Sequence, residues 1–155
     1  MEPQVMLSLG QAGAAAVLGL AAVGSAFGTG AAALSAIGVW KRAYALDKTA
    51  PFILVTFIGA PLSQTIYGMI LMNTIVQTAA QRAEAGDYVG FPAMLAAGVF
   101  GGLGMAASAY AQGRAGAVAA DAIGDTGKGL GNYLMAIGIV ETVALFVLVF
   151  IQATL

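Results

Sequence analysis

Long uncharged runs alternate with short polar segments along the chain. The runs cover Leu7–Trp40, Thr49–Gln81, Tyr88–Gly113 and Gly129–Leu155, and Glu141 alone interrupts the last of them. About 20 apolar residues cross a bilayer as a helix, so each run is long enough. Open strands would leave their backbone unpaired in hydrocarbon, and no run alternates as a barrel strand does. The pattern predicts an all-α membrane protein of four transmembrane helices.

Composition supports this prediction and narrows the chemistry. Hydrophobic residues make up 60% of the 155 residues and charged residues 8%, against roughly 25% charged in soluble domains. A chain of this size cannot bury so much apolar surface in one interior, so we expect a single membrane domain over residues 1–155. The net charge of −1 provides no excess of basic residues of the kind that binds nucleic acid. Cysteine and histidine are absent, which leaves carboxylates, amides, hydroxyls and backbone groups for a site.

The polar segments predict the topology. We expect connections at Lys41–Lys48, Arg82–Asp87 and Ala115–Lys128, and an uncleaved N-terminus, because Met1-Glu-Pro-Gln lacks a basic segment. Five of the six basic residues flank the first and third connections: Lys41, Arg42, Lys48, Arg114 and Lys128. The positive-inside rule places these two connections in the cytoplasm and both termini outside. Arg114 is expected to act there as a snorkelling anchor.

The two halves of the chain repeat each other. Ser25-Ala-Phe-Gly-Thr-Gly-Ala resembles Ser108-Ala-Tyr-Ala-Gln-Gly-Arg, and Gln64-Thr-Ile aligns with Glu141-Thr-Val. We therefore predict two tandem helical hairpins, over about residues 7–81 and 88–155. Both hairpins insert in the same direction, as in parallel repeats and unlike inverted ones.

Glycine is concentrated in alternate helices. Residues 10–38 and 90–116 hold seven glycines each, whereas residues 52–80 and 130–154 hold two each. Gly24 and Gly28, like Gly98 and Gly102, have the small-xxx-small spacing that lets helices approach closely. The pattern favours an inner ring of small helices and an outer ring of bulky, lipid-facing ones. Ordinary packing within a monomeric bundle is the alternative.

Glu141 is the strongest candidate for function, because it lies near the middle of its run. A charge at mid-membrane costs at least a few kcal/mol, so it persists only when it is paired, protonated or facing a polar cavity. The alternative is a neutral glutamic acid that hydrogen-bonds a neighbouring helix.

Oxygen-bearing residues occupy matching places in the other helices. Gln64 and Ser63 lie in the second run, and Pro61 before them frees a backbone carbonyl. Gln112 adds an amide from the third run. Hard cations take oxygen ligands, and one carboxylate neutralises one monovalent cation. Alternatively, the glutamines join helices, and Tyr67, one turn past Gln64, simply packs. Thr142 is expected either to bond its own backbone or to hold a water at the site.

These residues also carry a family resemblance. Ala60-Pro-Leu-Ser-Gln-Thr-Ile-Tyr-Gly68, Ala111-Gln-Gly113 and Val140-Glu-Thr142 resemble the proteolipid ring subunit (K or c subunit) of vacuolar-type rotary ATPases. The sodium-translocating bacterial members are the more similar ones, which implies a bacterial plasma membrane. The resemblance covers nearly the whole chain.

The resemblance implies a specific role for the chain. Identical subunits would form a homo-oligomeric ring, with the glycine-rich helices inside, that turns against a stator subunit with an essential arginine. A central stalk would connect the ring to a soluble head that hydrolyses ATP. The Na⁺ ligands would be the Ala60 carbonyl with Ser63, Gln64, Gln112 and Glu141, and Tyr67 would hydrogen-bond Glu141. Ser63 stands where the family often has threonine, Ala60 where a larger residue is common, and Leu62 replaces a small one.

Two alternatives to sodium transport by a rotor stay open at this point. Burial disfavours the charged form of a carboxyl, so the rotor could carry H⁺ instead, although a proton site needs little beyond the carboxylate. A small proton-coupled secondary transporter would also suit four helices and one glutamate; a purely structural proteolipid would leave Glu141 unexplained. The sequence has no GxxxxGK[ST] loop, so we expect no catalysis and no cofactor in this chain, and partners would handle ATP.

Overall fold

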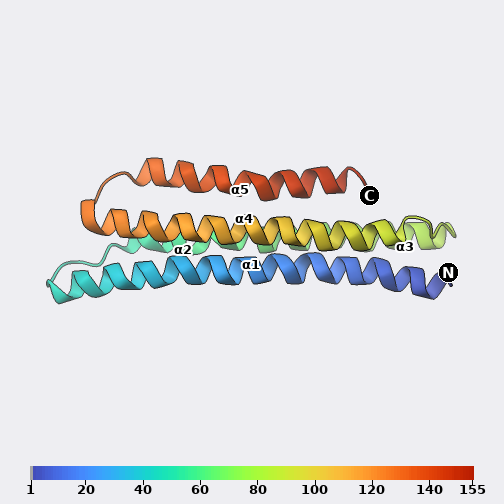
Figure 1. Cartoon of the computed structure of the whole chain (residues 1–155), viewed down its shortest axis with the longest axis horizontal. Coiled ribbons are helices and arrows are strands. Elements are labelled where there is room, and N and C mark those ends of the chain that lie inside the picture. The colour runs from blue at the N-terminus through green and yellow to red at the C-terminus, as the bar shows by residue number, and fades with distance from the viewer. Residues whose placement is uncertain (1) are drawn as a thin grey trace.

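The computed structural model describes residues 2–155, and Met1 of the expected uncleaved N-terminus lies outside them. Within these residues, four helical segments are long and apolar enough to cross a membrane: α1 (Pro3–Ala45), the segment Phe52–Glu84, α4 (Phe91–Thr126) and α5 (Leu130–Gln152). They lie side by side as long rods (Figure 1). This confirms the prediction of an all-helical chain with four apolar spans.

The second span is a helix with a break. It consists of η1 (Phe52–Leu54), α2 (Val55–Gly59), η2 (Ala60–Leu62) and α3 (Ser63–Glu84). The tight turn η2 coincides with Pro61, whose ring occupies the position of a helical N–H and so deprives the carbonyl of Phe57 of its usual partner. The break separates a short cap from the longer α3, and it lies where the sequence predicted a freed carbonyl.

The connections lie at other residues than expected, and the prediction for the third is largely wrong. Residues 115–126 are helical, so only residues 127–129 connect α4 to α5. Likewise, α1 continues to Ala45 and α3 to Glu84. A helix does not end where it leaves the hydrocarbon: at 1.5 Å per residue, α1 is about 64 Å long against a core of about 30 Å. The charged residues therefore indicate where the chain leaves the hydrocarbon, and they do not indicate where a helix ends.

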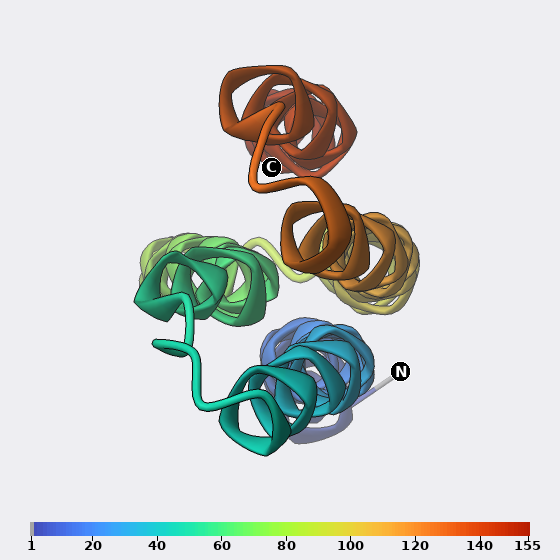
Figure 2. The same ribbon diagram turned by 90° about the vertical axis from the view of Figure 1, so that its left-hand side faces the viewer.

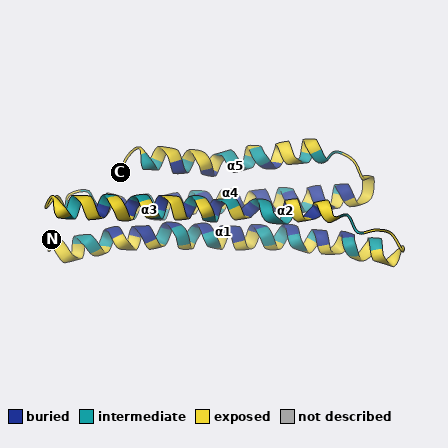
Figure 3. Ribbon diagram, turned by 180° about the vertical axis from the view of Figure 1, so that it is seen from behind, coloured by how far each residue is buried: buried dark blue, intermediate teal, exposed yellow. Residues whose placement is uncertain are grey.

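The helices are arranged with α1 and α5 at opposite sides of the bundle and with α2/α3 and α4 between them, as the end view shows (Figure 2). Buried residues follow the lines where helices meet, and exposed residues cover the outward faces (Figure 3). The closest approach joins α1 to α4, where backbones touch: a Cβ on Gly98 would collide with the backbone of Gly13, and one on Gly113 with that of Gly28. The small-residue spacing therefore does bring the two glycine-rich helices together.

Both termini lie at the same end of the bundle (Figure 1). At the other end, Arg42 of α1 forms ion pairs with Asp121 at 2.7 Å and with Asp125 at 3.1 Å, both on α4. These pairs are more than half exposed, so each contributes little to stability. They join the two helices at the end of the bundle opposite the termini.

Candidate ion site

The break in the second span creates a pair of oxygens at the start of α3. The carbonyl of Ala60 lies in η2 and accepts a hydrogen bond from Ser63 Oγ at 3.0 Å. A carbonyl oxygen has two lone pairs, so it can take a further partner. The local sequence Ala-Pro-Leu-Ser therefore sets a backbone oxygen beside a hydroxyl, two of the predicted ligands.

Glu141 projects from the middle of α5, eleven residues from either end of that helix. Its carboxylate receives one hydrogen bond on each oxygen: Tyr67 Oη donates to Oε1 at 2.6 Å, and Gln112 Nε2 donates to Oε2 at 3.1 Å. Tyr67 comes from α3 and Gln112 from α4. Three helices therefore fix the position of one carboxylate, and Gln112 lies at the same depth as Glu141.

Among the described residues, no basic side chain forms an ion pair with Glu141. The site therefore keeps the net charge of an unpaired carboxylate whenever Glu141 is ionised. Because such a charge is costly within a membrane, its neutralisation requires a proton or a cation from outside the chain.

The hydrogen bonds continue inward from the carboxylate. Gln64 Nε2 donates to Gln112 Oε1 at 2.8 Å, and Ser63 Oγ lies 3.2 Å from Gln64 Oε1. Both glutamine side chains are 0% exposed, so each polar atom must find its partner inside the protein. The two amides form a buried layer behind the half-buried carboxylate, with Ser63 and Ala60 at the far end.

Ser108 belongs to this network and was not predicted as a site residue. It is 4% exposed; its Oγ donates to the Val140 carbonyl at 3.0 Å and accepts from Gln64 Nε2 at 3.4 Å. Gln112 Nε2 also reaches the Ile137 carbonyl at 3.3 Å. The available signal was the spacing, because Ser108 lies one helical turn before Gln112 and hence on the same face.

The structure brings together Ala60, Ser63, Gln64, Tyr67, Gln112 and Glu141, and it leaves Thr142 outside the network. Thr142 Oγ1 donates to the carbonyl of Ile139 in its own helix at 2.7 Å. This is the backbone bond that was one of the two alternatives for Thr142. Pro61 contributes to the site indirectly, through the break that it makes in the helix.

The first hairpin lacks a carboxylate at the corresponding place. Ser25 and Thr29 match Ser108 and Gln112 in the repeat, and Gln64 matches Glu141. The hydroxyl oxygens of Ser25 and Thr29 are buried without a hydrogen-bond partner among the described residues. Each chain thus contains one carboxylate at this depth, and the first hairpin contributes Gln64 to the site of the second.

The second hairpin matches a known family. Residues 95–151 match the model of the family of ATP synthase C subunits. The matched segment contains three members of the network, Ser108, Gln112 and Glu141, and it supports the family that the sequence resembles. A comparison with curated proteins found no match. Proteins of the matched family are non-catalytic, ion-translocating proteolipids, and four apolar spans agree with a multi-pass membrane protein.

Proposed function

We propose that this chain is a rotor-ring subunit of a vacuolar-type rotary ATPase, and that it carries one Na⁺ per subunit at Glu141. The observation that supports it best is the unpaired carboxylate at the middle of α5, which is joined through hydrogen bonds to two buried amides, a hydroxyl and a carbonyl at a helix break. A proton needs only the carboxyl, whereas an oxygen-rich surrounding suits a hard cation. The side-chain ligands would be Ser63, Gln64, Gln112 and Glu141.

Sodium binding requires one rearrangement within the network. Gln112 presents its NH₂ group to Glu141, and Gln64 presents its NH₂ group to Gln112. A half-turn of the terminal amide exchanges donor for acceptor at almost no change in shape. Turning the amide of Gln112 would direct its oxygen toward a cation beside Glu141. Turning the amide of Gln64 as well would keep the hydrogen bond between the two amides, with Gln112 now the donor, while Tyr67 could keep its bond to the carboxylate.

The placement of Glu141 suits an ion that is exchanged during rotation. Glu141 is half-buried, whereas the two glutamines behind it are fully buried, so an ion could approach from the α5 side. With Na⁺ bound, the site is neutral and can face lipid; once emptied, the negative carboxylate would be attracted to the arginine of a stator subunit. Transport against 100 mV requires roughly 2.3 kcal/mol per charge, which ATP hydrolysis in the soluble head would supply.

Carbodiimide labelling tests the cargo directly, since the reagent modifies a protonated carboxyl in an apolar setting. Labelling of Glu141 should slow when NaCl replaces KCl at constant ionic strength and pH. Gln64→Leu removes one oxygen ligand and should raise the Na⁺ concentration for half-protection about tenfold. The matched control, Gln77→Leu, changes an exposed glutamine of the same helix and should leave protection intact.

The results of these experiments distinguish Na⁺ from H⁺ as the cargo and test the role of Glu141. Labelling that responds to pH alone would make H⁺ the cargo and the glutamines a link between helices. If Glu141→Gln left ATP-driven ion uptake intact in the reconstituted complex, the ion-carrying role of this residue would be wrong.

Oligomeric state separates the rotor from the secondary transporter. A ring predicts that the purified protein, in mild detergent, has a mass that is a large multiple of 15.4 kDa. Native mass spectrometry or light scattering with detergent correction measures it. A monomer or dimer that persists across several mild detergents would favour the transporter.

A further inference from the structure

Two hydroxyl groups of α1 are buried beside the hydrogen-bond network and take no part in it. The side-chain oxygens of Ser25 and Thr29 have no hydrogen-bond partner among the described residues, and Ser25 is 2% exposed. Neither hydroxyl bonds the carbonyl four residues earlier in its own helix, as those of Ser8 and Thr126 do. Because a buried polar group without a partner is costly, each hydroxyl requires one.

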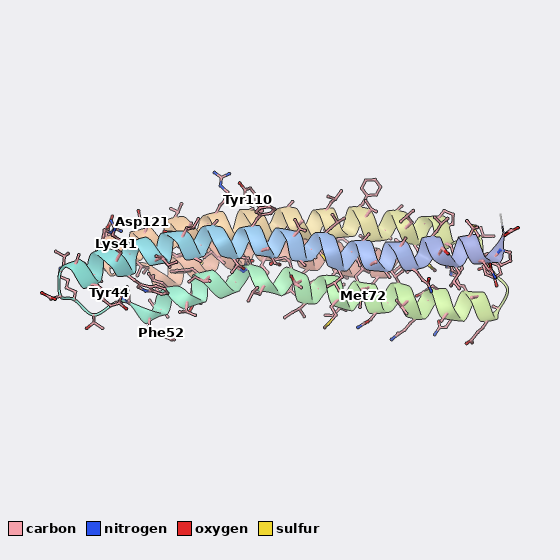
Figure 4. All side chains as sticks on the ribbon, turned by 90° about the horizontal axis from the view of Figure 1, so that it is seen from below. Lys41, Tyr44, Phe52, Met72, Tyr110 and Asp121 are labelled. Carbon is pink, nitrogen blue, oxygen red and sulfur yellow. The ribbon has the colours of Figure 1, made fainter. Side chains whose placement is uncertain are left out.

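The packing of α1 against the second span sets the level of these hydroxyls. In Figure 4, α1 lies between α4 above it and α3 below it. A Cβ on Gly68 of α3 would lie 2.7 Å from Ala21 Cβ, and a Cβ on Gly28 of α1 would lie 2.9 Å from Pro61 Cβ. The two contacts are seven residues apart on both helices, which run in opposite directions. The register of α1 on the second span is therefore uniform across the ion site.

This register places the two hydroxyls level with groups of the ion site. Four residues inward from the first contact on each helix, Ser25 lies opposite Gln64, and both belong to the faces that meet. One residue beyond the second contact, Thr29 lies level with Ala60, whose carbonyl accepts from Ser63. The hydroxyls are thus behind the part of the network that begins at the helix break.

The packing of α1 on α4 gives the same level independently. A Cβ on Gly24 would collide with the backbone of Ala106. Ser25 follows Gly24 directly and Ser108 follows Ala106 by two residues, so the two serines lie at nearly the same level of two helices that run in the same direction. Ser108 accepts from Gln64 Nε2. Both neighbours of α1 therefore place Ser25 beside the Gln64 amide.

One water molecule can serve both hydroxyls. Residues four apart on a helix have Cβ atoms roughly 5–6 Å apart, and a water with two hydrogen bonds of about 2.8 Å joins oxygens up to roughly 5.6 Å apart. A buried water typically makes about three hydrogen bonds to groups that otherwise lack partners. Gln64 Oε1 is a suitable third partner of Ser25 and Thr29, because it has two lone pairs and accepts only from Ser63 within the described chain.

We propose that Ser25 and Thr29 hold one buried water that hydrogen-bonds the Gln64 amide from behind the ion site. Water both donates and accepts, so it keeps a bond to Gln64 whichever way the amide is turned. This consequence rests on the proposed function, in which sodium binding turns the amide, whereas the water site itself does not. Ser25 and Thr29 are then positioning residues, which act on the ion through Gln64.

The sign of a stability change tests the water site. The purified full-length protein is unfolded thermally in mild detergent and KCl, and circular dichroism gives the midpoint. Ser25→Ala and Thr29→Val each remove a hydroxyl that bonds the water, so each should lower the midpoint by about 2–4 °C. Thr29→Ser keeps the hydroxyl and should unfold as the wild type does.

The opposite results have distinct physical meanings. A hydroxyl without a partner would give a higher midpoint when it is removed, because the cost of burying it disappears. A hydroxyl that bonds its own helix would give an unchanged midpoint. Either result for Ser25→Ala would overturn the proposal.

A double-mutant cycle tests the link to Gln64. In the Gln64→Leu variant, the water has already lost its partner in the site, so Ser25→Ala should lower the midpoint clearly less than it does in the wild type. Equal losses in the two backgrounds would show that the hydroxyl of Ser25 does not act through Gln64 and would overturn the link.

Sodium protection of Glu141 against carbodiimide measures the effect on the ion. Ser25→Ala should raise the Na⁺ concentration for half-protection about threefold. Ser35→Ala is the matched control on α1, because it removes the bond from Ser35 Oγ to the Ala117 carbonyl at 2.6 Å. It should lower the midpoint and leave half-protection unchanged, so a general loosening of α1 is distinguished from an effect on Gln64.

The two proposals fail separately. If Na⁺ does not protect Glu141 in the wild type, the sodium cargo is wrong, and the midpoints in KCl still decide whether Ser25 and Thr29 hold a water. If Na⁺ protects the wild type and Ser25→Ala equally well, the sodium cargo stands and the positioning role of Ser25 is wrong.

Discussion

At the scale of single residues, the molecule is organised around the Glu141 carboxylate. Its two oxygens accept from Tyr67 and Gln112, which belong to different helices. A hydrogen bond to a charged group contributes about 1.5–3 kcal/mol, and a buried polar group that loses its partner costs a similar amount. Each donor therefore positions the carboxylate. Each donor would also lose its hydrogen-bond partner if the carboxylate were removed.

Tyr67→Phe tests this arrangement. The substitution keeps the ring and removes the hydroxyl that donates to Oε1 at 2.6 Å. The freed carboxylate should adopt other rotamers, so the Na⁺ concentration for half-protection against carbodiimide should rise about tenfold. Tyr44→Phe is the control, since Tyr44 is 67% exposed at the end of α1. An unchanged protection curve in Tyr67→Phe would show that the hydroxyl does not position the carboxylate.

The sequence was most informative where a residue type was rare in its surroundings. Glu141 and Gln64 are conspicuous within apolar runs, because a buried carboxyl or amide needs a partner, and the structure places both in one network. Ser108 was not recognised as a partner of Gln64. A serine in a transmembrane helix can satisfy itself by bonding its own backbone, so its presence in a helix rich in glycine and alanine gives no warning of a long-range contact.

At the scale of elements, glycine sets the distance between α1 and α4. A Cβ on Gly28 would collide with the Ala109 carbonyl and would lie 2.9 Å from Pro61 Cβ. Without side chains between them, helices gain van der Waals contact directly between backbones. The contact with Pro61 also ties α1 to the break at which the site begins.

Gly28→Ala should therefore loosen the contact among α1, α4 and the break. Overpacking of this kind costs about 1–3 kcal/mol, and the loss should appear as a lower midpoint in thermal unfolding followed by circular dichroism in detergent. Gly30→Ala is a matched control two residues along the same helix, because a Cβ there would meet nothing within 4 Å. Equal midpoints for the two variants would contradict close packing at Gly28.

The extents of the elements were less predictable than their number. The uncharged runs predicted all four spans. However, the third run ends at Gly113, whereas the helix α4 continues to Thr126. The extra segment contains many alanines, which favour helix in water as well as in lipid. Charged residues such as Asp121 and Asp125 mark the exit from the membrane, and they pair with Arg42 on the neighbouring helix without ending their own.

At the scale of the whole molecule, the chain is polarised along its long axis. Both termini lie at one end (Figure 1), and the paired charges of Arg42, Asp121 and Asp125 lie at the other. The outward faces are apolar in between: on α5, for example, Met135, Ile139 and Phe150 are each more than 60% exposed. Such a surface requires lipid or further subunits around it.

The distribution of basic residues predicts which end faces the cytoplasm. Lys41, Arg42, Lys48 and Lys128 belong to the end opposite the termini, so this end should be cytoplasmic and both termini outside. The chain has no cysteine, so a single introduced cysteine can be labelled without background. Thr154→Cys, just past α5, should react with a membrane-impermeant maleimide added to intact cells.

Thr49→Cys is the matched test in the connection between α1 and η1, where Thr49 is likewise exposed. It should react only after the cells are opened, because the bilayer separates it from the reagent. The reverse pattern would place the termini in the cytoplasm and would contradict the positive-inside assignment. In that case, the cytoplasmic stalk of the proposed rotor would have to contact the end that carries the termini and Arg82, rather than the end where Arg42 joins α1 to α4.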